Sequence, residues 1–200
     1  RRGGRGSHEG GRLRVTSLWR VFPFDPAAEP GALFSPSFVP PTTGRGRFDL
    51  PVDRSPVLYV SESQEHAVAE ALQPWCNRPL TPHHLERAGR PLAMVRVEVP
   101  DDPGSGLLDL CDPAVLRDLD AAPDRVASRH RWVTQPIARA VWDAGHAGLR
   151  WWSAFWGDWH GSVLFMTRLG AASFDEPRPL TLETPAVATA AQALGMPLAA

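Results

Sequence analysis

Short apolar segments separated by turns run through much of the chain, and they predict strands more often than helices. Residues 17–22 form a first predicted strand that Pro23 ends, and residues 57–60 form a second in which Tyr59 shares a face with Val57. Residues 93–99 alternate apolar and polar side chains, which is typical of a strand with one exposed face. A turn is expected at 102–106, and further short extended segments at 107–110 and 162–166.

One helix is predicted at 63–73, with Ser63 as its N-cap and Pro74 ending it. Its apolar stripe follows helical spacing and consists of Val68, Ala71, Leu72 and Trp75. At about 100° per residue, Glu70 lies roughly 200° from Val68, outside that stripe. We therefore expect the Glu70 carboxylate to face a cleft or solvent.

Weaker helical signals occur later in the chain. Pro113 at a first helical position predicts a helix over 113–120, and Thr134 is the expected N-cap of a helix over 134–143. A weak helix is expected near 187–194. Because strands outnumber strong helices and no βα alternation recurs, a mixed α+β domain is favoured over a doubly wound sheet.

Composition divides the chain into three parts. Residues 1–15 are rich in Gly and Arg and lack periodicity, which is typical of a flexible tail. Residues 16–170 hold the predicted elements, together with a long irregular connection at 23–56, and ordered loops of that length are usually functional. Residues 171–200 are Ala/Pro-rich and low in charge, and we find no chemistry in them.

The overall composition indicates one folded domain. The 200 residues are 43% hydrophobic and 22% charged, which excludes a wholly disordered chain. A net charge of −1 and a pI near 6.7 argue against direct binding to nucleic acid or an anionic membrane. No apolar run approaches a membrane span, and the chain opens without the apolar stretch of a signal peptide. We therefore expect a cytoplasmic protein.

The residue types also limit the chemistry. Every one of the 21 basic residues is an arginine, and the absence of lysine excludes Schiff-base chemistry and a Walker-type phosphate loop. The two cysteines and seven histidines have no metal-ligand spacing, so no metal site is expected. Ser153 lacks the Gly-x-Ser-x-Gly context of a hydrolase nucleophile.

One set of residues combines anion-binding and acidic groups: Arg20, Arg47, Tyr59 and Glu70. An arginine inside a strand needs a partner or an anion, and the guanidinium fork suits phosphate. The single tyrosine is able to stack on a flat heterocycle, and Glu70 to stabilise positive charge on a sugar ring. Taken alone, each feature is more commonly structural: a salt bridge, a solvated carboxylate, or core packing for the four tryptophans in residues 151–159.

Read in order, several segments resemble the RES domain, a family named for an arginine, a glutamate and a serine. The matching residues are Leu18-Trp19-Arg20-Val21-Phe22, Gly46-Arg47-Phe48-Asp49, Val57-Leu58-Tyr59-Val60-Ser61, Ala67-Val68-Ala69-Glu70, Thr134-Gln135, and Gly148-Leu149-Arg150-Trp151-Trp152-Ser153. The resemblance covers residues 17–167. Family members often have Tyr-Pro-Ser where this chain has Trp151-Trp152-Ser153.

The resemblance implies an ADP-ribosyltransferase-like fold and a toxin that uses NAD as its substrate, without a metal, and that is paired with an Xre-like antitoxin protein. By position, Arg20 and Arg47 would hold the pyrophosphate or an acceptor phosphate, and Tyr59 would stack on nicotinamide. Glu70 would stabilise the oxocarbenium-like state, and Ser153 would complete the pocket. The predicted catalytic set is therefore Glu70, Arg47 and Tyr59.

The sequence leaves three candidate functions open. The first is cleavage of the nicotinamide–ribose bond with water or phosphate as acceptor. The second is mono-ADP-ribosylation of a protein, and the third is a non-catalytic module that binds a nucleotide or an antitoxin. The oligomeric state, including a homo-oligomer, is also left open.

Overall fold

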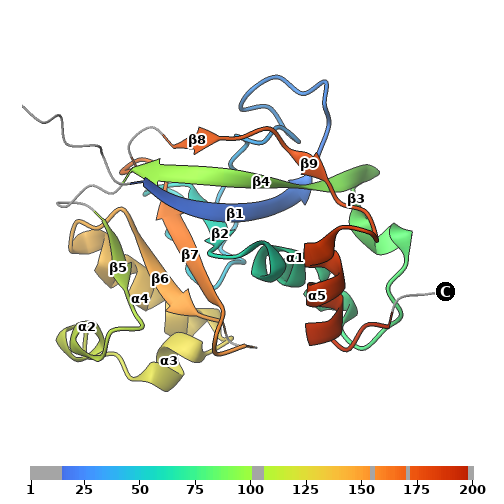
Figure 1. Ribbon diagram of the computed structural model, residues 1–200. Helices are drawn as coiled ribbons and strands as arrows, with labels where there is room; N and C mark the ends of the chain where they lie inside the picture. The colour runs from blue at the N-terminus through green and yellow to red at the C-terminus, as the bar shows by residue number, and fades with distance from the viewer. Residues whose placement is uncertain (1–14, 101–105, 154–155, 170–171, 198–200) are drawn as a thin grey trace, which may run out of the picture.

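The computed structural model describes residues 15–100, 106–153, 156–169 and 172–197. Within these residues, nine strands form one mixed sheet whose main path runs β3-β4-β1-β2-β7-β6-β5, with β8 and β9 paired to β4 (Figure 1). The strands are β1 (Val15–Pro23), β2 (Val57–Ser61), β3 (Glu86–Arg87), β4 (Arg90–Pro100), β5 (Leu107–Asp109), β6 (Gly148–Trp152), β7 (His160–Phe165), β8 (Ser173–Phe174) and β9 (Arg178–Pro179). The β5–β6 pair is parallel and the other described pairs are antiparallel.

The sheet has two well-paired halves that meet at a narrow contact. β1 pairs with β4 along its full length, and β2 pairs with β7 along its full length. Between these halves, β1 and β2 share a single register position, Trp19 opposite Ser61. Beyond that position the two strands diverge, and the side chains that follow Trp19 and precede Ser61 border the opening between them.

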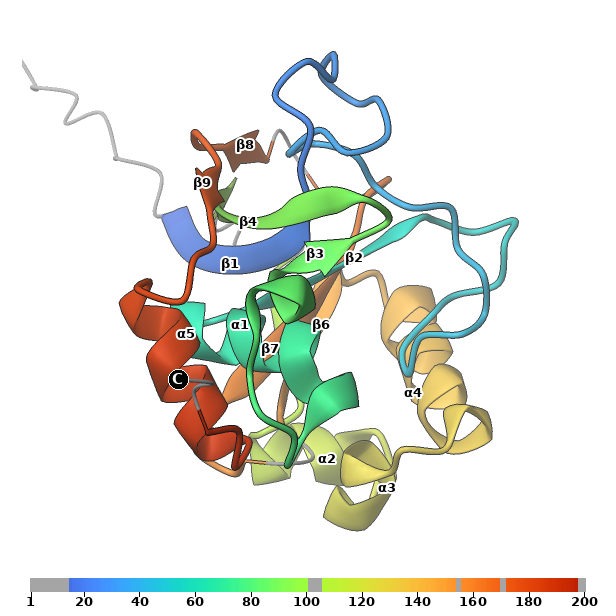
Figure 2. The same ribbon diagram turned by 90° about the vertical axis from the view of Figure 1, so that its right-hand side faces the viewer.

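The helices lie in two groups on different parts of the sheet. They are α1 (Gln64–Leu72), α2 (Pro113–Asp118), α3 (Pro123–Ala127), α4 (Arg131–Asp143) and α5 (Pro185–Ala193), with short 3-10 turns η1 (Gln73–Trp75) and η2 (Pro82–Leu85). α1 and α5 lie side by side, while α2, α3 and α4 lie together near β5, β6 and β7 (Figures 1 and 2).

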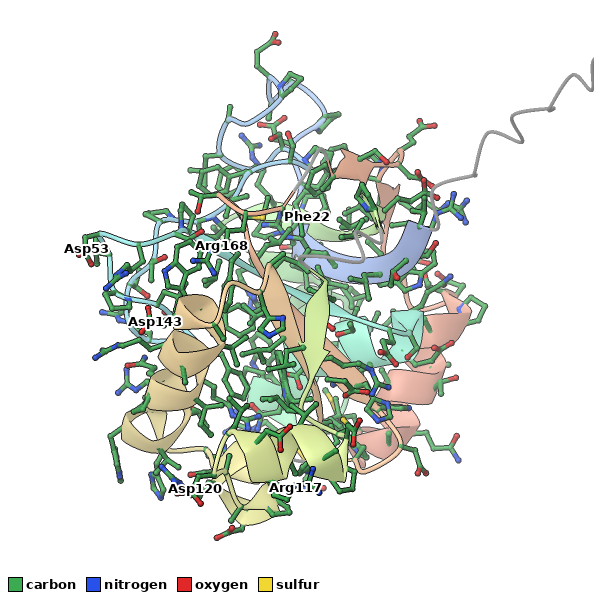
Figure 3. All side chains as sticks on the ribbon, turned by 90° about the vertical axis from the view of Figure 1, so that its left-hand side faces the viewer. Phe22, Asp53, Arg117, Asp120, Asp143 and Arg168 are labelled. Carbon is green, nitrogen blue, oxygen red and sulfur yellow. The ribbon has the colours of Figure 1, made fainter. Side chains whose placement is uncertain are left out.

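Strand alternation divides the core. On β4, Leu92 and Met94 pack with α1 and α5, whereas the alternating residues Ala93, Val95, Val97 and Val99 pack on the other face. A third cluster joins β6 and β7 to α2, α3 and α4, and side chains fill the space between them (Figure 3). Arg168, just after β7, donates hydrogen bonds to the carbonyls of Trp142 and His146 and fixes the end of α4.

The structure confirms the expected α+β class and most predicted elements. The helix predicted at 63–73 is α1, and the Ser63 hydroxyl accepts a hydrogen bond from the His66 amide, as an N-cap does. The expected cap of α4 is wrong, because this helix begins three residues earlier and Thr134 is buried inside it. Helix α3 was not predicted; its five residues are too few to show a helical period.

The Ala/Pro-rich C-terminal segment contributes to the same fold. Its described part supplies β8, β9 and α5, and α5 packs Val187 and Ala190 against α1. Residues 1–14 and most of the turn expected at 102–106 lie outside the described residues. In the described ranges, no helix combines the length and apolarity that crossing a bilayer requires.

Candidate functional site

A cavity of about 420 Å³ opens where β1 and β2 diverge. Its walls come from β1, β2, α1, β3, the loop between β1 and β2, and the facing strands β6 and β7. Chemically distinctive side chains on these walls are Arg20, Tyr59, His66, Glu70, Arg87 and Trp151. This volume is within the range of about 300–1,000 Å³ that is usual for small-molecule sites.

Arg20 brings a buried cation to the cavity. Its side chain projects from β1, and Nη1 donates hydrogen bonds to the carbonyls of Phe38 (2.7 Å) and Pro36 (3.0 Å). Burial lowers the pKa of Arg20 to about 10, so the group remains charged at neutral pH. Nε and Nη2 receive no hydrogen-bond acceptor from the described residues, so these donors are available to an anion.

The Tyr59 hydroxyl forms hydrogen bonds with the loop between β1 and β2. The hydroxyl donates to Asp49 Oδ1 and accepts from the Phe48 amide, both at 2.9 Å. Asp49 Oδ2 in turn accepts from the Gly46 amide at 2.9 Å. Burial, together with the negative charge of Asp49, raises the pKa of Tyr59 above its usual value. The phenol is therefore neutral, and the ring contributes an apolar surface to the cavity.

Glu70 faces the cavity from α1. Its side chain is 52% exposed, which agrees with its predicted position outside the apolar stripe. Glu70 Oε1 lies 3.2 Å from Nε2 of His66, one helical turn earlier. The cavity therefore has a carboxylate on one wall and the Arg20 guanidinium on another.

Arg47 and Ser153 are not among the residues that line this cavity. Arg47 donates from Nη2 to the Val126 carbonyl (2.6 Å) and from Nε to the Ser128 carbonyl (3.0 Å). Burial lowers the pKa of Arg47, and the negative charge of Glu70 opposes this shift, so the two side chains interact electrostatically.

Ser153 is buried just after the end of β6, and its amide donates to the Trp159 carbonyl. From that strand, Trp151 lines the cavity instead. The structure thus brings Arg20, Tyr59 and Glu70 together around one cavity and leaves Arg47 and Ser153 outside its lining.

The adjacent Thr134 and Gln135 of α4 anchor the Gly-rich part of the loop. The Thr134 hydroxyl donates to the Arg47 carbonyl. The Gln135 side-chain amide donates to the carbonyls of Gly44 and Gly46, both at 3.0 Å. α4 therefore shapes the wall that Gly46 and Asp49 contribute to the cavity.

His66 and Arg87 are among the polar residues of the cavity wall that the sequence did not predict. His66 precedes Glu70 by four residues, and that helical spacing was a usable signal. Arg87 follows η2, and its Nη2 donates to the Ala71 carbonyl at 2.9 Å. No pattern in the sequence connects Arg87 to Glu70, because their proximity depends on the hairpin that β3 makes with β4.

The described residues contain no group of three or more His, Cys, Asp or Glu side chains arranged to hold a metal ion. The polar side chains of the cavity wall instead include two guanidinium groups, a histidine and two carboxylates. The Asp49 carboxylate accepts hydrogen bonds from Tyr59 and Gly46, whereas Glu70 is half-exposed. Such a set is suited to an anionic ligand that develops positive charge near Glu70.

Comparison with known proteins adds a family and a fold. The RES domain family model matches residues 17–189. A chain in the crystal structure of the M. tuberculosis MbcT–MbcA toxin–antitoxin complex is similar, with a TM-score of 0.59 and 15% identity, over 92% of this chain and 90% of that one. No curated protein sequence matches significantly. The structural likeness confirms the mixed α+β fold. The match over most of its length shows that the chain belongs to the RES domain family.

Proposed function

We propose that this RES domain protein is a toxin that cleaves the bond between nicotinamide and ribose in NAD. The main support for the proposal is that Arg20, Tyr59 and Glu70 line the same cavity. These residues come from β1, β2 and α1, and together they supply a cation, an aromatic ring and a carboxylate. In a dinucleotide, the cation would bind the diphosphate, the aromatic ring would stack on the flat base, and the carboxylate would face the sugar between them.

The reaction begins with loss of nicotinamide. The bond between C1′ of the ribose and the ring nitrogen breaks, and both electrons of that bond leave with nicotinamide, which departs as a neutral molecule. The ribose then carries oxocarbenium-like positive charge. Water or phosphate forms the new bond at C1′, and the hydroxyl proton of the acceptor is released. The products are nicotinamide and either ADP-ribose or its 1-phosphate.

Glu70 stabilises the cationic ribose in this scheme. A carboxylate that is already in place when positive charge develops lowers the barrier more than one that must reorganise. Arg20 holds the diphosphate through Nε and Nη2, the donors that its contacts with the loop leave available. Tyr59 offers its ring to nicotinamide, while its hydroxyl is engaged by Asp49.

Arg47 and Ser153 have supporting roles in the proposal. Two of the Arg47 donors bind the Val126 and Ser128 carbonyls, so Arg47 contributes mainly long-range positive charge toward Glu70. Ser153 completes the site by supporting the strand that carries Trp151.

The same proposal includes an antitoxin protein that blocks the activity. The similar fold in the MbcT–MbcA structure comes from a toxin–antitoxin complex. Family membership and that likeness over nine-tenths of the chain support a comparable pairing here. Co-expression of the protein with its proposed antitoxin should restore growth that the protein alone arrests.

A nicotinamide-release assay, run with and without inorganic phosphate, tests the enzymatic proposal. We expect nicotinamide in large molar excess over protein. ADP-ribose identifies water as the acceptor, and ADP-ribose 1-phosphate identifies phosphate. NAD that carries a label in its ADP-ribose part separates these outcomes from protein modification, which leaves the label on a macromolecule. NAD binding without nicotinamide release would refute the enzymatic proposal.

A further inference from the structure

His66 is a buried residue of α1 whose two ring nitrogens both face acceptor groups. Its side chain is 2% exposed. Nδ1 lies 3.0 Å from the His160 carbonyl oxygen, and Nε2 lies 3.2 Å from Glu70 Oε1. A carbonyl oxygen only accepts, so Nδ1 must carry a hydrogen. The contact with Glu70 is a hydrogen bond only when a proton lies between Nε2 and Oε1.

The surroundings hold the His66 ring in one orientation. Its backbone amide donates to the Ser63 hydroxyl at the N-terminus of α1. The Trp159 ring lies with its centroid 5.5 Å from the imidazole centroid. The bond to the His160 carbonyl attaches the ring to β7. The imidazole therefore has little freedom to rotate.

Glu70, in contrast, is half-exposed. A glutamate side chain has several rotamers in solution, and holding one of them costs conformational entropy. Among the described residues, His66 makes the hydrogen bond that opposes this freedom. Because His66 and Glu70 both line the cavity, the bond acts on the carboxylate where a ligand would meet it.

We propose that His66 is the positioning residue of Glu70: it fixes Oε1, so that Oε2 is presented to the ribose of NAD. This inference rests on the proposed function. The imidazole does not touch the reacting atoms in this scheme, and it acts only through the carboxylate. A displacement of about 1 Å at a reacting group is able to reduce a rate by about 100-fold.

Two substitutions of His66 separate its two hydrogen bonds. In His66→Gln the terminal amide nitrogen lies near the position of Nε2 and still donates to Glu70. In His66→Asn the shorter side chain reaches only the position of Nδ1, so the bond to Glu70 is lost. We expect His66→Asn to lower kcat by about 10- to 100-fold with KM for NAD changed less than about threefold. His66→Gln should retain most of kcat, and the exposed His83→Asn is the matched control.

A double-mutant cycle shows whether the effect passes through Glu70. If it does, His66→Asn should change turnover less than about twofold in the Glu70→Gln background. An equal loss in both backgrounds would overturn the positioning role. So would equal losses from His66→Asn and His66→Gln, because a purely structural role does not depend on the donor toward Glu70.

Nitrogen NMR of the imidazole provides a readout that does not depend on NAD turnover. The His66 signals are identified by their absence in His66→Gln. We expect Nδ1 to resonate as a protonated nitrogen and the Nε2 signal to move in Glu70→Gln. An unprotonated Nδ1, or an Nε2 signal indifferent to Glu70, would refute the arrangement. Failure of wild-type nicotinamide release with these NMR results intact would refute only the proposed function.

Discussion

The Tyr59 hydroxyl donates a 2.9 Å hydrogen bond to Asp49 Oδ1, and this bond ties the long loop to the central strand β2. The same hydroxyl accepts from the Phe48 amide, so one side chain satisfies two groups of the loop. Asp49 is buried, and both of its carboxylate oxygens have donors. The tyrosine thus builds the cavity wall as well as offering its ring to a ligand.

Replacement of Tyr59 by Phe keeps the ring and removes both hydroxyl contacts. Asp49 Oδ1 and the Phe48 amide then lose their partner, and each unsatisfied buried group costs about 1–3 kcal/mol. We expect the free energy of unfolding, measured by denaturant titration, to fall by about 2–6 kcal/mol, the sum for the two groups. A variant as stable as the wild type would contradict the structural role of the hydroxyl.

Tyr59 also predicts a dependence of stability on alkaline pH. Its pKa is raised in the folded protein, so the folded state keeps the phenol proton that the unfolded state loses above about pH 10. The contribution of Tyr59 to stability is therefore complete below that pH and declines as pH rises above it. Since this is the single tyrosine of the chain, phenolate absorbance reports on it alone. Phenolate that forms in the native protein at the same pH as in urea would contradict the prediction.

Gly46 is confined by the same contacts. A Cβ atom at this position would lie 2.2 Å from Asp49 Oδ1 and 2.3 Å from the Tyr59 hydroxyl. We expect Gly46→Ala to disrupt the hydrogen bonds that Asp49 makes with Tyr59 and Gly46, and to destabilise the protein by about 1–3 kcal/mol. Because Gly46 lines the cavity, the affinity for NAD should also fall. Gly157→Ala is the control, because, its two chain neighbours apart, no heavy atom of the described residues lies within 4 Å of its added Cβ. Equal unfolding midpoints for the two variants would refute this packing argument.

Arg20→Lys tests whether Arg20 binds the diphosphate of NAD. Lysine keeps the charge, but its compact ammonium group does not reproduce the planar spacing that lets Arg20 bind the Pro36 and Phe38 carbonyls through Nη1 while Nε and Nη2 face an anion. We expect KM for NAD to rise about 10- to 150-fold, because one charge-assisted hydrogen bond is worth about 1.5–3 kcal/mol. Arg96→Lys on the exposed side of β4 should leave KM unchanged. An unaltered KM in Arg20→Lys would remove Arg20 from the binding site.

Local patterns in the sequence predict much of the site on α1. The stripe that begins at Val68 sets the helix rotation, and this rotation alone directs Glu70 away from the core. Ser63 as N-cap sets where the helix begins, and from that start Glu70 falls at a position that lines the cavity. Both features depend on neighbours within one or two turns, so single-sequence reasoning captures them.

The remaining features depend on contacts between distant segments. Arg47 pairs with the carbonyls of Val126 and Ser128, at the end of a helix too short to predict. Thr134 is compatible with an N-cap by local pattern, yet its hydroxyl binds the Arg47 carbonyl from inside α4. These roles follow from how α3, α4 and the loop pack together, and no local pattern encodes that packing.

The role of Glu70 in catalysis is tested most directly by comparing nicotinamide release by the wild type, Glu70→Gln and Glu65→Gln. Glu65 lies on the same helix but does not line the cavity, so its variant controls for loss of a carboxylate. We predict that Glu70→Gln lowers turnover by two or more orders of magnitude, about 2.7–4 kcal/mol of barrier, with an unchanged unfolding midpoint. Glu65→Gln should match the wild type. Wild-type turnover in Glu70→Gln would contradict a catalytic role of this carboxylate.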